Sequence, residues 1–281
     1  MIVWIASYPK SGNTWIRSII AGLVYSEDGI FEFNKLHQLG QFPAKKYFNG
    51  LTSEYENIHE LKKYWITAQE KINLKDDVTF LKTHHLNCKI NNYKFTNQEN
   101  TAGIIYVVRD PRNVVTSLAN FLSIKMNDSK NLLFNQSQLM GDEKLSWGEN
   151  IRSLIGTWSE NYKSWTMANE NLLLIKYENL IKDPISEIKK IVIFIKRFKK
   201  IEISDEKINN VLKSTSFSNL KKLEEDNQFG ESSINKETNE KVKFFNMGKN
   251  NNWEKILDSE VAKEIEEKLF KEMSELGYLK E

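Results

Sequence analysis

The first 25 residues run from an apolar segment through a short polar turn into an amphipathic segment, and this order constrains the fold most strongly. Residues 2–6 are a short apolar run of the kind that forms a buried parallel strand. In Asn13–Tyr25, apolar residues recur at helical spacing. The first N–H groups of a helix lack partners and attract anions. The sequence therefore predicts an anion-binding turn between strand and helix, at residues 7–12.

Further strands and helices alternate along the chain. We expect strands at 78–83, 103–108 and 172–177, and helices at 111–122, 149–169, 183–198, 205–213 and 259–276. Such alternation predicts an α/β protein with a mainly parallel central sheet flanked by helices on both faces. Together with the opening turn, it indicates a P-loop-like fold of three layers.

The length of 281 residues suits one large α/β domain, and we expect a single domain over residues 1–281. Three irregular regions are expected to shape a substrate pocket. They are an aromatic-rich region at about 27–75, a polar excursion at about 123–147, and a polar, mobile loop at 224–243.

Charge and cysteine content exclude several classes of protein. The net charge of +2 gives no sign of a nucleic-acid partner. The one cysteine, Cys88, can form no internal disulfide and no cysteine-rich metal site, which fits a reducing compartment. No apolar run is long enough to cross a bilayer, and the apolar start lacks the features of a signal peptide. We expect a cytoplasmic protein without a transmembrane segment.

The opening turn matches the phosphate loop of nucleotide hydrolases only in part. That loop reads G-x-x-x-x-G-K-[ST], and SYPKSGNT (7–14) lies in its frame. Gly12 and Thr14 match, but Asn13 stands at the lysine position and the lysine has moved back to Lys10. No convincing Mg²⁺-binding acid follows, because Asp110 stands between an arginine and a proline. A small-molecule kinase that uses ATP and Mg²⁺ is therefore an alternative that Asn13 disfavours.

The longer string YPKSGNTW (8–15) resembles the 5′-phosphosulfate loop of the cytosolic-type sulfotransferases, usually Y-P-K-[SA]-G-[TN]-T-W. Further motifs in the right order extend the resemblance over most of the chain, which is identified as a bacterial member of that family. The resemblance implies 3′-phosphoadenosine 5′-phosphosulfate (PAPS) as sulfuryl donor, adenosine 3′,5′-bisphosphate (PAP) as product, and no metal. It places Lys10 on the bridging oxygen of the leaving phosphate. The residues that it assigns to the 5′-phosphate are Ser11, Gly12, Asn13, Thr14 and Trp15.

The segment FLKTHH (80–85) resembles the K-T-H segment of the same family. Side chains alternate between the faces of a strand, so Lys82 and His84 share one face and His85 points the other way. Histidine is suited to remove a proton from an attacking hydroxyl near neutral pH. We therefore interpret His84 as the general base, Lys82 as a cation that stabilises the transferring oxygens, and His85 as structural.

Three further segments resemble the nucleotide site of the family. In IIYVVRDPRNVVTSLANF (104–121), Arg109 and Ser117 are implied to bind the 3′-phosphate, and an arginine fork with a hydroxyl suits a phosphate dianion. The strand LLLIKY (172–177) implies Tyr177 on or near the adenine. The segment STSF (214–217) implies Thr215 and Phe217 at the nucleotide.

The segment FFNMGKNNNW (244–253) resembles F-x-R-K-G-x-x-x-x-W but departs from it. Gly248 matches, whereas Asn246 and Met247 replace the arginine and lysine that help clamp the 3′-phosphate. Asn246 can still donate a hydrogen bond there. This departure supports a second alternative, a non-catalytic nucleotide-binding protein.

Together these motifs imply in-line transfer of a sulfuryl group from PAPS to an acceptor. The acceptor group is a hydroxyl, less readily an amine, on a small molecule, a lipid or a sugar. No motif sets the oligomeric state.

Overall fold

The computed structural model describes residues 1–281 except 76, 141–150, 169–170, 227–228, 236–237 and 280–281. In this part of the chain, the central sheet has five strands in the order β2–β3–β1–β6–β9, and every neighbouring pair is parallel. The strands are β1 (Ile2–Ser7), β2 (Gly40–Gln41), β3 (Thr79–Thr83), β6 (Thr101–Val108) and β9 (Leu172–Lys176). The sheet confirms the predicted α/β class, and the short β2 is a strand that the sequence did not predict.

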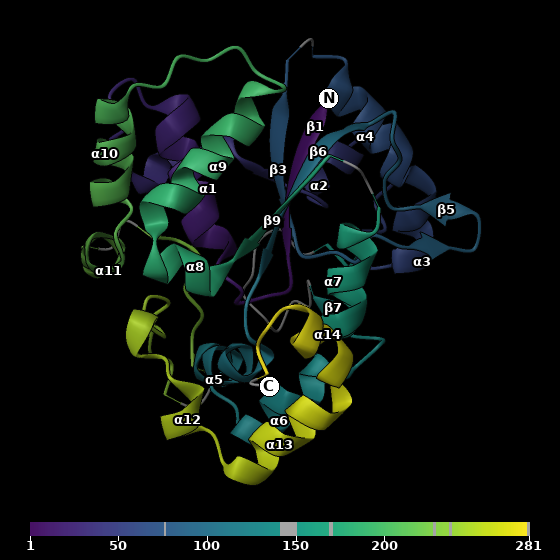
Figure 1. Ribbon diagram of the computed structural model, residues 1–281. Coiled ribbons are helices and arrows are strands. Elements are labelled where there is room, and N and C mark those ends of the chain that lie inside the picture. The colour runs from purple at the N-terminus through teal and green to yellow at the C-terminus, as the bar shows by residue number, and fades with distance from the viewer. Residues whose placement is uncertain (76, 141–150, 169–170, 227–228, 236–237, 280–281) are drawn as a thin grey trace.

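Helices cover both faces of this sheet, as Figure 1 shows. One face packs against α1 (Asn13–Tyr25) and α9 (Pro184–Lys196), which α10 (Asp205–Ser214) covers from outside, and the other face packs against α4 (Trp65–Asn73) and α7 (Trp158–Thr166). Because side chains alternate along a strand, Val3 and Ile5 pack with the first group of helices, while Trp4 and Ala6 pack with the second. The fold therefore has the three predicted layers.

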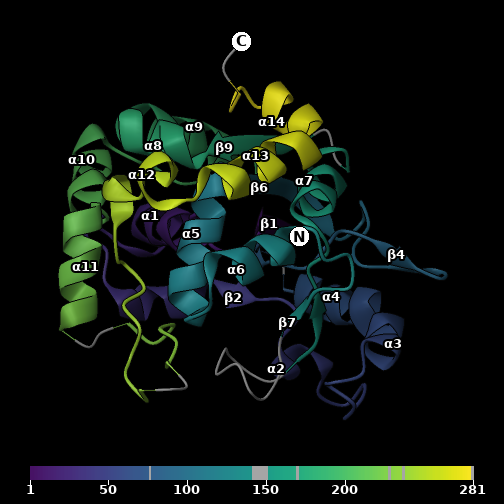
Figure 2. The ribbon, with the colours of Figure 1, turned by 90° about the horizontal axis from the view of Figure 1, so that it is seen from below.

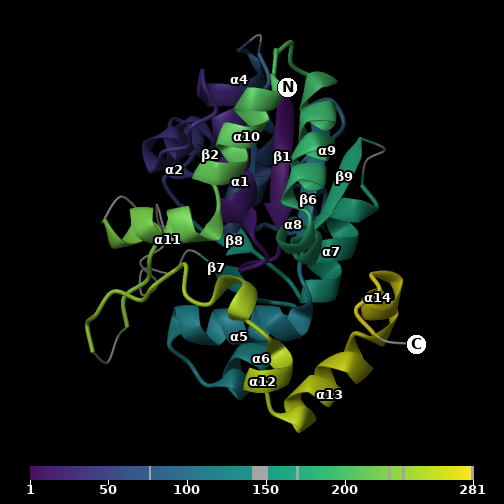
Figure 3. The ribbon, with the colours of Figure 1, turned by 60° about the vertical axis from the view of Figure 1, so that its left-hand side comes forward.

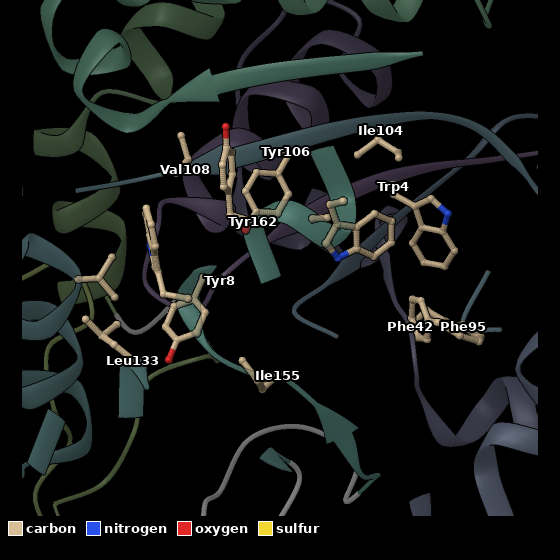
Figure 4. Close-up of a cluster of buried hydrophobic side chains, with 14 of the residues drawn as sticks. Trp4, Tyr8, Phe42, Phe95, Ile104, Tyr106, Val108, Leu133, Ile155 and Tyr162 are labelled. Carbon is tan, nitrogen blue, oxygen red and sulfur yellow. The ribbon is translucent and has the colours of Figure 1, made fainter. Parts of the chain in front are cut away.

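The core on the α4 and α7 side is rich in aromatic rings (Figure 4). The ring of Trp4 lies 5.7 Å, centroid to centroid, from the rings of Phe42, Phe95 and Trp165. Its Nε1 donates a hydrogen bond to Thr101 Oγ1 at 3.0 Å. Burial of side chains of this size stabilises a fold by about 1.5–3 kcal/mol each. These rings hold β1 and its neighbours in a rigid sheet.

A further group of helices lies beyond the carboxyl ends of the strands (Figures 1 and 2). It comprises α5 (Pro111–Leu122), α6 (Met126–Leu133), α12 (Trp253–Ile256), α13 (Ser259–Lys268) and α14 (Phe270–Glu275). In Figure 3, the chain runs from α11 (Phe217–Glu225) past α5 to α12. The other elements are η1 (Phe33–Gln38), α2 (Lys45–Phe48), α3 (Ile58–Leu61), η2 (Lys62–Tyr64), β4 (Lys89–Ile90), β5 (Tyr93–Lys94), β7 (Leu139–Met140), β8 (Ser153–Leu154), α8 (Tyr177–Lys182) and η3 (Gly248–Asn250).

The helix predicted at 149–169 begins later than expected, at the start of α7. Gly156 has a φ of 67°, in the left-handed region that ends regular structure. Thr157 then caps α7 through a capping box with Glu160. The prediction was therefore wrong over residues 151–157, which include β8, and residues 149, 150 and 169 lie outside the described part of the chain.

Two further sequence predictions are refined by the structure. The helix predicted at 259–276 is divided at the buried Leu269 into α13 and α14. Of the loop predicted at 224–243, the first two residues end α11, and Ile234 and Lys241 form an isolated antiparallel bridge.

The helices that the structure describes are all too short or too polar to traverse a bilayer.

Candidate active site

A cavity of about 280 Å³ lies where β1, β3, β6 and β9 end. In open α/β sheets this carboxyl edge is where ligands bind. The predicted site residues that line the cavity are Lys10, Gly12, Asn13, Thr14, Trp15, Lys82, His84, Arg109, Ser117, Tyr177, Phe217, Asn246, Met247 and Gly248. The structure therefore brings together most of the side chains that the motifs singled out.

Two predicted residues do not line the cavity. The Ser11 side chain is buried, and its Oγ has no hydrogen-bond partner within the described part of the chain. Thr215 is also buried, and its hydroxyl donates to the carbonyl oxygen of Val211 at 2.7 Å. The hydroxyl of Thr215 thus serves the end of α10, whereas that of Ser11 remains free of protein partners.

The turn after β1 has the backbone of a cradle. Lys10 has a φ of 64° and Gly12 a φ of 107°, so both adopt left-handed conformations. A Cβ atom on Gly12 would lie 2.6 Å from the Tyr177 ring, so this position requires glycine. No side chain caps α1, so none competes with an anion for its first N–H groups.

The side chain of Asn13 stabilises this turn from within. Its Nδ2 donates to the carbonyl oxygen of Ile5 at 3.0 Å and to Ser7 Oγ at 3.2 Å. The residue at the lysine position of a nucleotide-hydrolase loop is therefore tied to β1. Lys10, three positions earlier, supplies the cation instead.

The ammonium group of Lys10 lies between two aromatic rings. Its Nζ is 3.5 Å from the centroid of Phe244 and 4.1 Å from that of Phe121, within the range of cation–π attraction. Burial, with a smaller contribution from Arg109, lowers the pKa of Lys10 well below its usual value. The rings thus hold a partly desolvated cation beside the turn.

His84, which follows β3, is held in one tautomer by the end of β1. Its Nδ1 lies 2.8 Å from the carbonyl oxygen of Ser7, and a carbonyl can only accept. Nδ1 therefore carries the proton, and Nε2 has the free lone pair. Burial, followed by the charge of Lys82, lowers the pKa of His84 to about 3, so the ring is neutral near pH 7.

The neighbouring His85 is part of the core. Its ring stacks on Phe95 with centroids 4.1 Å apart, and its Nδ1 bonds the carbonyl oxygen of Leu86. Burial lowers its pKa to about 3. These contacts agree with the structural role predicted for it.

Sequence reasoning missed an ion cluster beside Lys82. The Glu231 carboxylate pairs with Arg17 at 2.6 Å and lies 3.7 Å from Lys82 Nζ. Burial lowers the pKa of Lys82 to about 8, although Glu231 opposes the shift. Burial alone would raise the pKa of Glu231, but Arg17 and Lys82 outweigh it and lower that pKa. Arg17 follows Thr14 by one helical turn, and this spacing was the available signal.

The predicted 3′-phosphate residues Arg109 and Ser117 line the same cavity. The Arg109 guanidinium lies 4.2 Å from the centroid of the Tyr177 ring and donates to the carbonyl oxygen of Lys10 at 3.1 Å. Its Nε is buried without a partner. Asn246 Nδ2 donates to Asn120 Oδ1 at 2.8 Å, so this amide is placed beside the helix that carries Ser117.

The acid considered for Mg²⁺ has a structural role. Asp110 caps α5 and pairs with Arg112 at 2.7 Å. Among the residues that the structure describes, no three His, Cys, Asp or Glu side chains gather as metal ligands would. The cluster that lines the cavity is instead made of lysines, an arginine, a histidine and one glutamate.

The fold and the cavity define the class of this protein as an α/β protein with a candidate oxyanion site at the carboxyl edge of a parallel sheet. Residues 2–277 match the family model described as Sulfotransferase domain. The chain therefore belongs to the sulfotransferase domain family.

Related proteins are sulfotransferases of insects, mammals and plants. Luciferin sulfotransferase of Photinus pyralis is 26% identical over 222 residues, which cover 77% of this chain and 56% of the relative. The 3-alpha-hydroxysteroid sulfotransferase of Cavia porcellus is 28% identical over 223 residues, which cover 79% and 66%. Flavonol 3-sulfotransferase of Flaveria bidentis is 24% identical over 278 residues, which cover 98% and 82%. The chain thus spans 56% and 66% of the first two relatives.

Solved structures share the fold. A mouse sulfotransferase complexed with PAP superposes with a TM-score of 0.60 at 19% identity, covering 97% of this chain and 83% of the other. Retinol dehydratase in complex with retinol and PAP gives a TM-score of 0.61 at 17% identity, with coverages of 97% and 81%. At these identities the likeness establishes the P-loop-like fold alone.

Proposed function

We propose that this protein transfers a sulfuryl group from PAPS to a hydroxyl of a small-molecule acceptor. The observation that carries the proposal is the tautomer of His84, whose Nε2 lone pair is free beside Lys82 and beside the turn that carries Lys10. A general base next to two cations suits a reaction that removes a proton and moves an anionic group. The sulfotransferase relatives support the same reaction class.

The residues present fit the donor. The turn requires glycine at Gly12, leaves the first amides of α1 uncapped and buries an unpartnered Ser11 Oγ. Arg109, with an unpartnered Nε, offers a fork for the 3′-phosphate, and Ser117 offers a hydroxyl. The aromatic rings of Tyr177 and Phe217 offer surfaces on which the adenine ring of the donor could stack. With Asn246 and Met247 in place of two cations, we expect the 3′-phosphate to depend chiefly on Arg109.

In the proposed step, His84 Nε2 takes the proton of the acceptor hydroxyl as its oxygen bonds to sulfur. The bond from sulfur to the bridging oxygen breaks, and PAP leaves with the electron pair. Lys10 stabilises the charge that grows on that oxygen, and Lys82 stabilises the sulfuryl oxygens. Preorganised cations of this kind act mainly on the transition state.

The acceptor is proposed to enter between β2 and the antiparallel pair of β7 and β8. Apolar side chains line this part of the cavity, with few polar groups among them. The lining residues there are Gln41, Phe42, Met140, Ile151, Ser153 and Ile155. Such a wall suits an apolar scaffold with one hydroxyl, as in a small molecule or a lipid, better than a sugar.

We propose one domain over residues 1–281 and the cytoplasm as its compartment, which suits a chain with one cysteine.

The test is incubation with PAPS labelled in its sulfuryl group and a panel of phenols, sterols, lipids, sugars and amines. The proposal predicts label in an organic sulfate, lost in His84→Ala. Transfer of a phosphoryl group from ATP–Mg²⁺ to the same panel would instead support the kinase. PAP binding without any transfer would support a nucleotide-binding protein that lacks catalysis.

A further inference from the structure

The carboxylate of Glu231 lies among three side chains that could all bind an oxyanion. Arg17 Nη2 donates to both of its oxygens, at 2.6 and 2.7 Å. The Thr14 hydroxyl donates to Oε2 at 3.4 Å, and Lys82 Nζ lies 3.7 Å from the same oxygen. Lys82 already belongs to the proposed sulfuryl site, and Thr14 belongs to the adjoining turn that is proposed to hold the 5′-phosphate. The carboxylate therefore stands where an oxygen of the transferred group would meet them.

The cations of this cluster are buried, whereas the carboxylate is partly exposed. The side chains of Arg17 and Lys82 are 4% and 8% exposed, whereas that of Glu231 is 36% exposed. Glu231 lines the cavity, and Arg17, which does not line it, is bonded to the Glu231 carboxylate. A glutamate can turn away towards solvent by rotating its own bonds, but the buried cations cannot follow it. If it turned away, two buried positive charges would need another anion.

Arg17 also has hydrogen-bonding capacity that Glu231 does not use. Its Nε is buried, and no residue that the structure describes accepts a hydrogen bond from it. A guanidinium carries five N–H donors in a planar fork. A carboxylate has two oxygens, whereas a sulfuryl group in transfer has three. The arginine is thus better matched to an anion with more oxygens.

We propose that Arg17, Lys82 and Thr14 form an oxyanion subsite for the sulfuryl group of the donor, and that the Glu231 carboxylate competes for it. The inference rests on the proposed function and adds Arg17 to the residues that contact the transferred group. Glu231 acts as an internal stand-in for the ligand. It keeps the buried cations paired and leaves when the donor arrives.

The experiment uses inorganic sulfate as the probe and thermal unfolding as the readout, with chloride at matched ionic strength as reference. A ligand that binds the folded state raises Tm according to its affinity, even in a destabilised variant. Glu231→Gln keeps the shape of the side chain and removes its charge. Glu225→Gln is the matched control, because Glu225 is an exposed glutamate on the neighbouring helix α11.

Sulfate should raise the Tm of Glu231→Gln more than that of the wild type or of Glu225→Gln, consistent with an affinity about tenfold higher. Adding Arg17→Met to Glu231→Gln should abolish the gain. Equal sulfate affinity in Glu231→Gln and the wild type would overturn the inference, as would a gain that survives Arg17→Met. Binding of PAP to the same proteins reports separately on the proposed function. Failure of the wild type to bind PAP would refute that function. If the wild type binds PAP but sulfate raises the Tm of Glu231→Gln no more than that of the wild type, only the subsite is refuted.

Discussion

Nδ1 of His84 lies 2.8 Å from the carbonyl oxygen of Ser7, so the strand that leads into the anion-binding turn also orients the proposed base. One backbone segment thus positions both the donor cradle and the group that takes the proton. The side chain of Asn13, in the turn region, also bonds this residue, because its Nδ2 donates to Ser7 Oγ. The base and the turn are therefore expected to respond together to changes at the end of β1.

Replacing His84 by alanine should lower kcat by roughly 10²–10⁴-fold, because general-base catalysis contributes about this much. The affinity for PAP should change little, since the imidazole acts on the acceptor. Single-turnover rates with labelled PAPS, together with PAP titration, separate the two quantities. His59→Ala, at an exposed histidine on α3, is the control and should behave as the wild type. A His84→Ala protein with normal turnover would remove the base from the account.

Replacing Lys10 by alanine should cost about 3 kcal/mol of transition-state stabilisation, which is roughly a hundredfold in kcat. The physical reason is that charge grows on the bridging oxygen only as the bond to sulfur breaks. Lys243→Ala, at a lysine whose side chain is 64% exposed, serves as the control. If kcat were unchanged in Lys10→Ala, the cation held between Phe121 and Phe244 would have no catalytic role.

The pH dependence of kcat/KM for PAPS should have an alkaline limb but no limb near the ordinary pKa of histidine. Burial lowers the pKa of Lys82 to about 8, so its charged fraction falls as pH rises through that value, and the rate falls with it. Burial lowers the pKa of His84 to about 3, so the base is already neutral well below pH 7. A profile between about pH 5 and 10 checks both statements.

In Lys82→Arg the part of the alkaline limb that Lys82 contributes should disappear, because a guanidinium stays protonated throughout this range. Lys10, whose pKa burial also lowers, should still titrate. A rate that climbs through about pH 6.5 in the wild type would show that the base titrates like an ordinary histidine.

Gly12→Ala should disrupt donor binding. Its φ of 107° is unfavourable for alanine, and the added Cβ would lie 2.6 Å from the Tyr177 ring. A displaced cradle can lower kcat/KM by about a hundredfold. Gly50→Ala is the matched control, because Gly50 has a φ of 74° but nothing within 4 Å of the added atom. It should lose stability by about 1 kcal/mol and keep its affinity for PAP.

The sheet could be predicted because its strands are apolar runs that end in recognisable turns. β1 and β6 are fully buried, so their sequences carry almost no polar residues. The strand β2 has only two residues, Gly40 and Gln41, and forms no apolar run. It belongs to the sheet through its pairing with β3, which the local sequence does not indicate. The start of α7 was missed because a helical pattern upstream of Gly156 outweighed the capping signal of Thr157.

The candidate site could be predicted where its residues sit on strand ends and helix starts. Lys82 lies near the end of β3, while Lys10, His84 and Arg109 follow strands, and parallel strands bring such residues to one edge. Glu231 comes from a polar segment with no periodicity, and only the fold brings it to Arg17, 214 residues away in the chain. Contacts of this kind leave no local pattern to read.

The central claim is that the turn and Arg109 bind the bisphosphate of a sulfuryl donor, and calorimetric titration with PAP tests it most directly. Purified protein should bind PAP without added metal, more tightly than ATP–Mg²⁺, and Arg109→Ala should lose most of this affinity. Arg197→Ala, at an exposed arginine that ends α9, should retain it. Preference for ATP–Mg²⁺, or PAP binding that is indifferent to Arg109, would contradict the account.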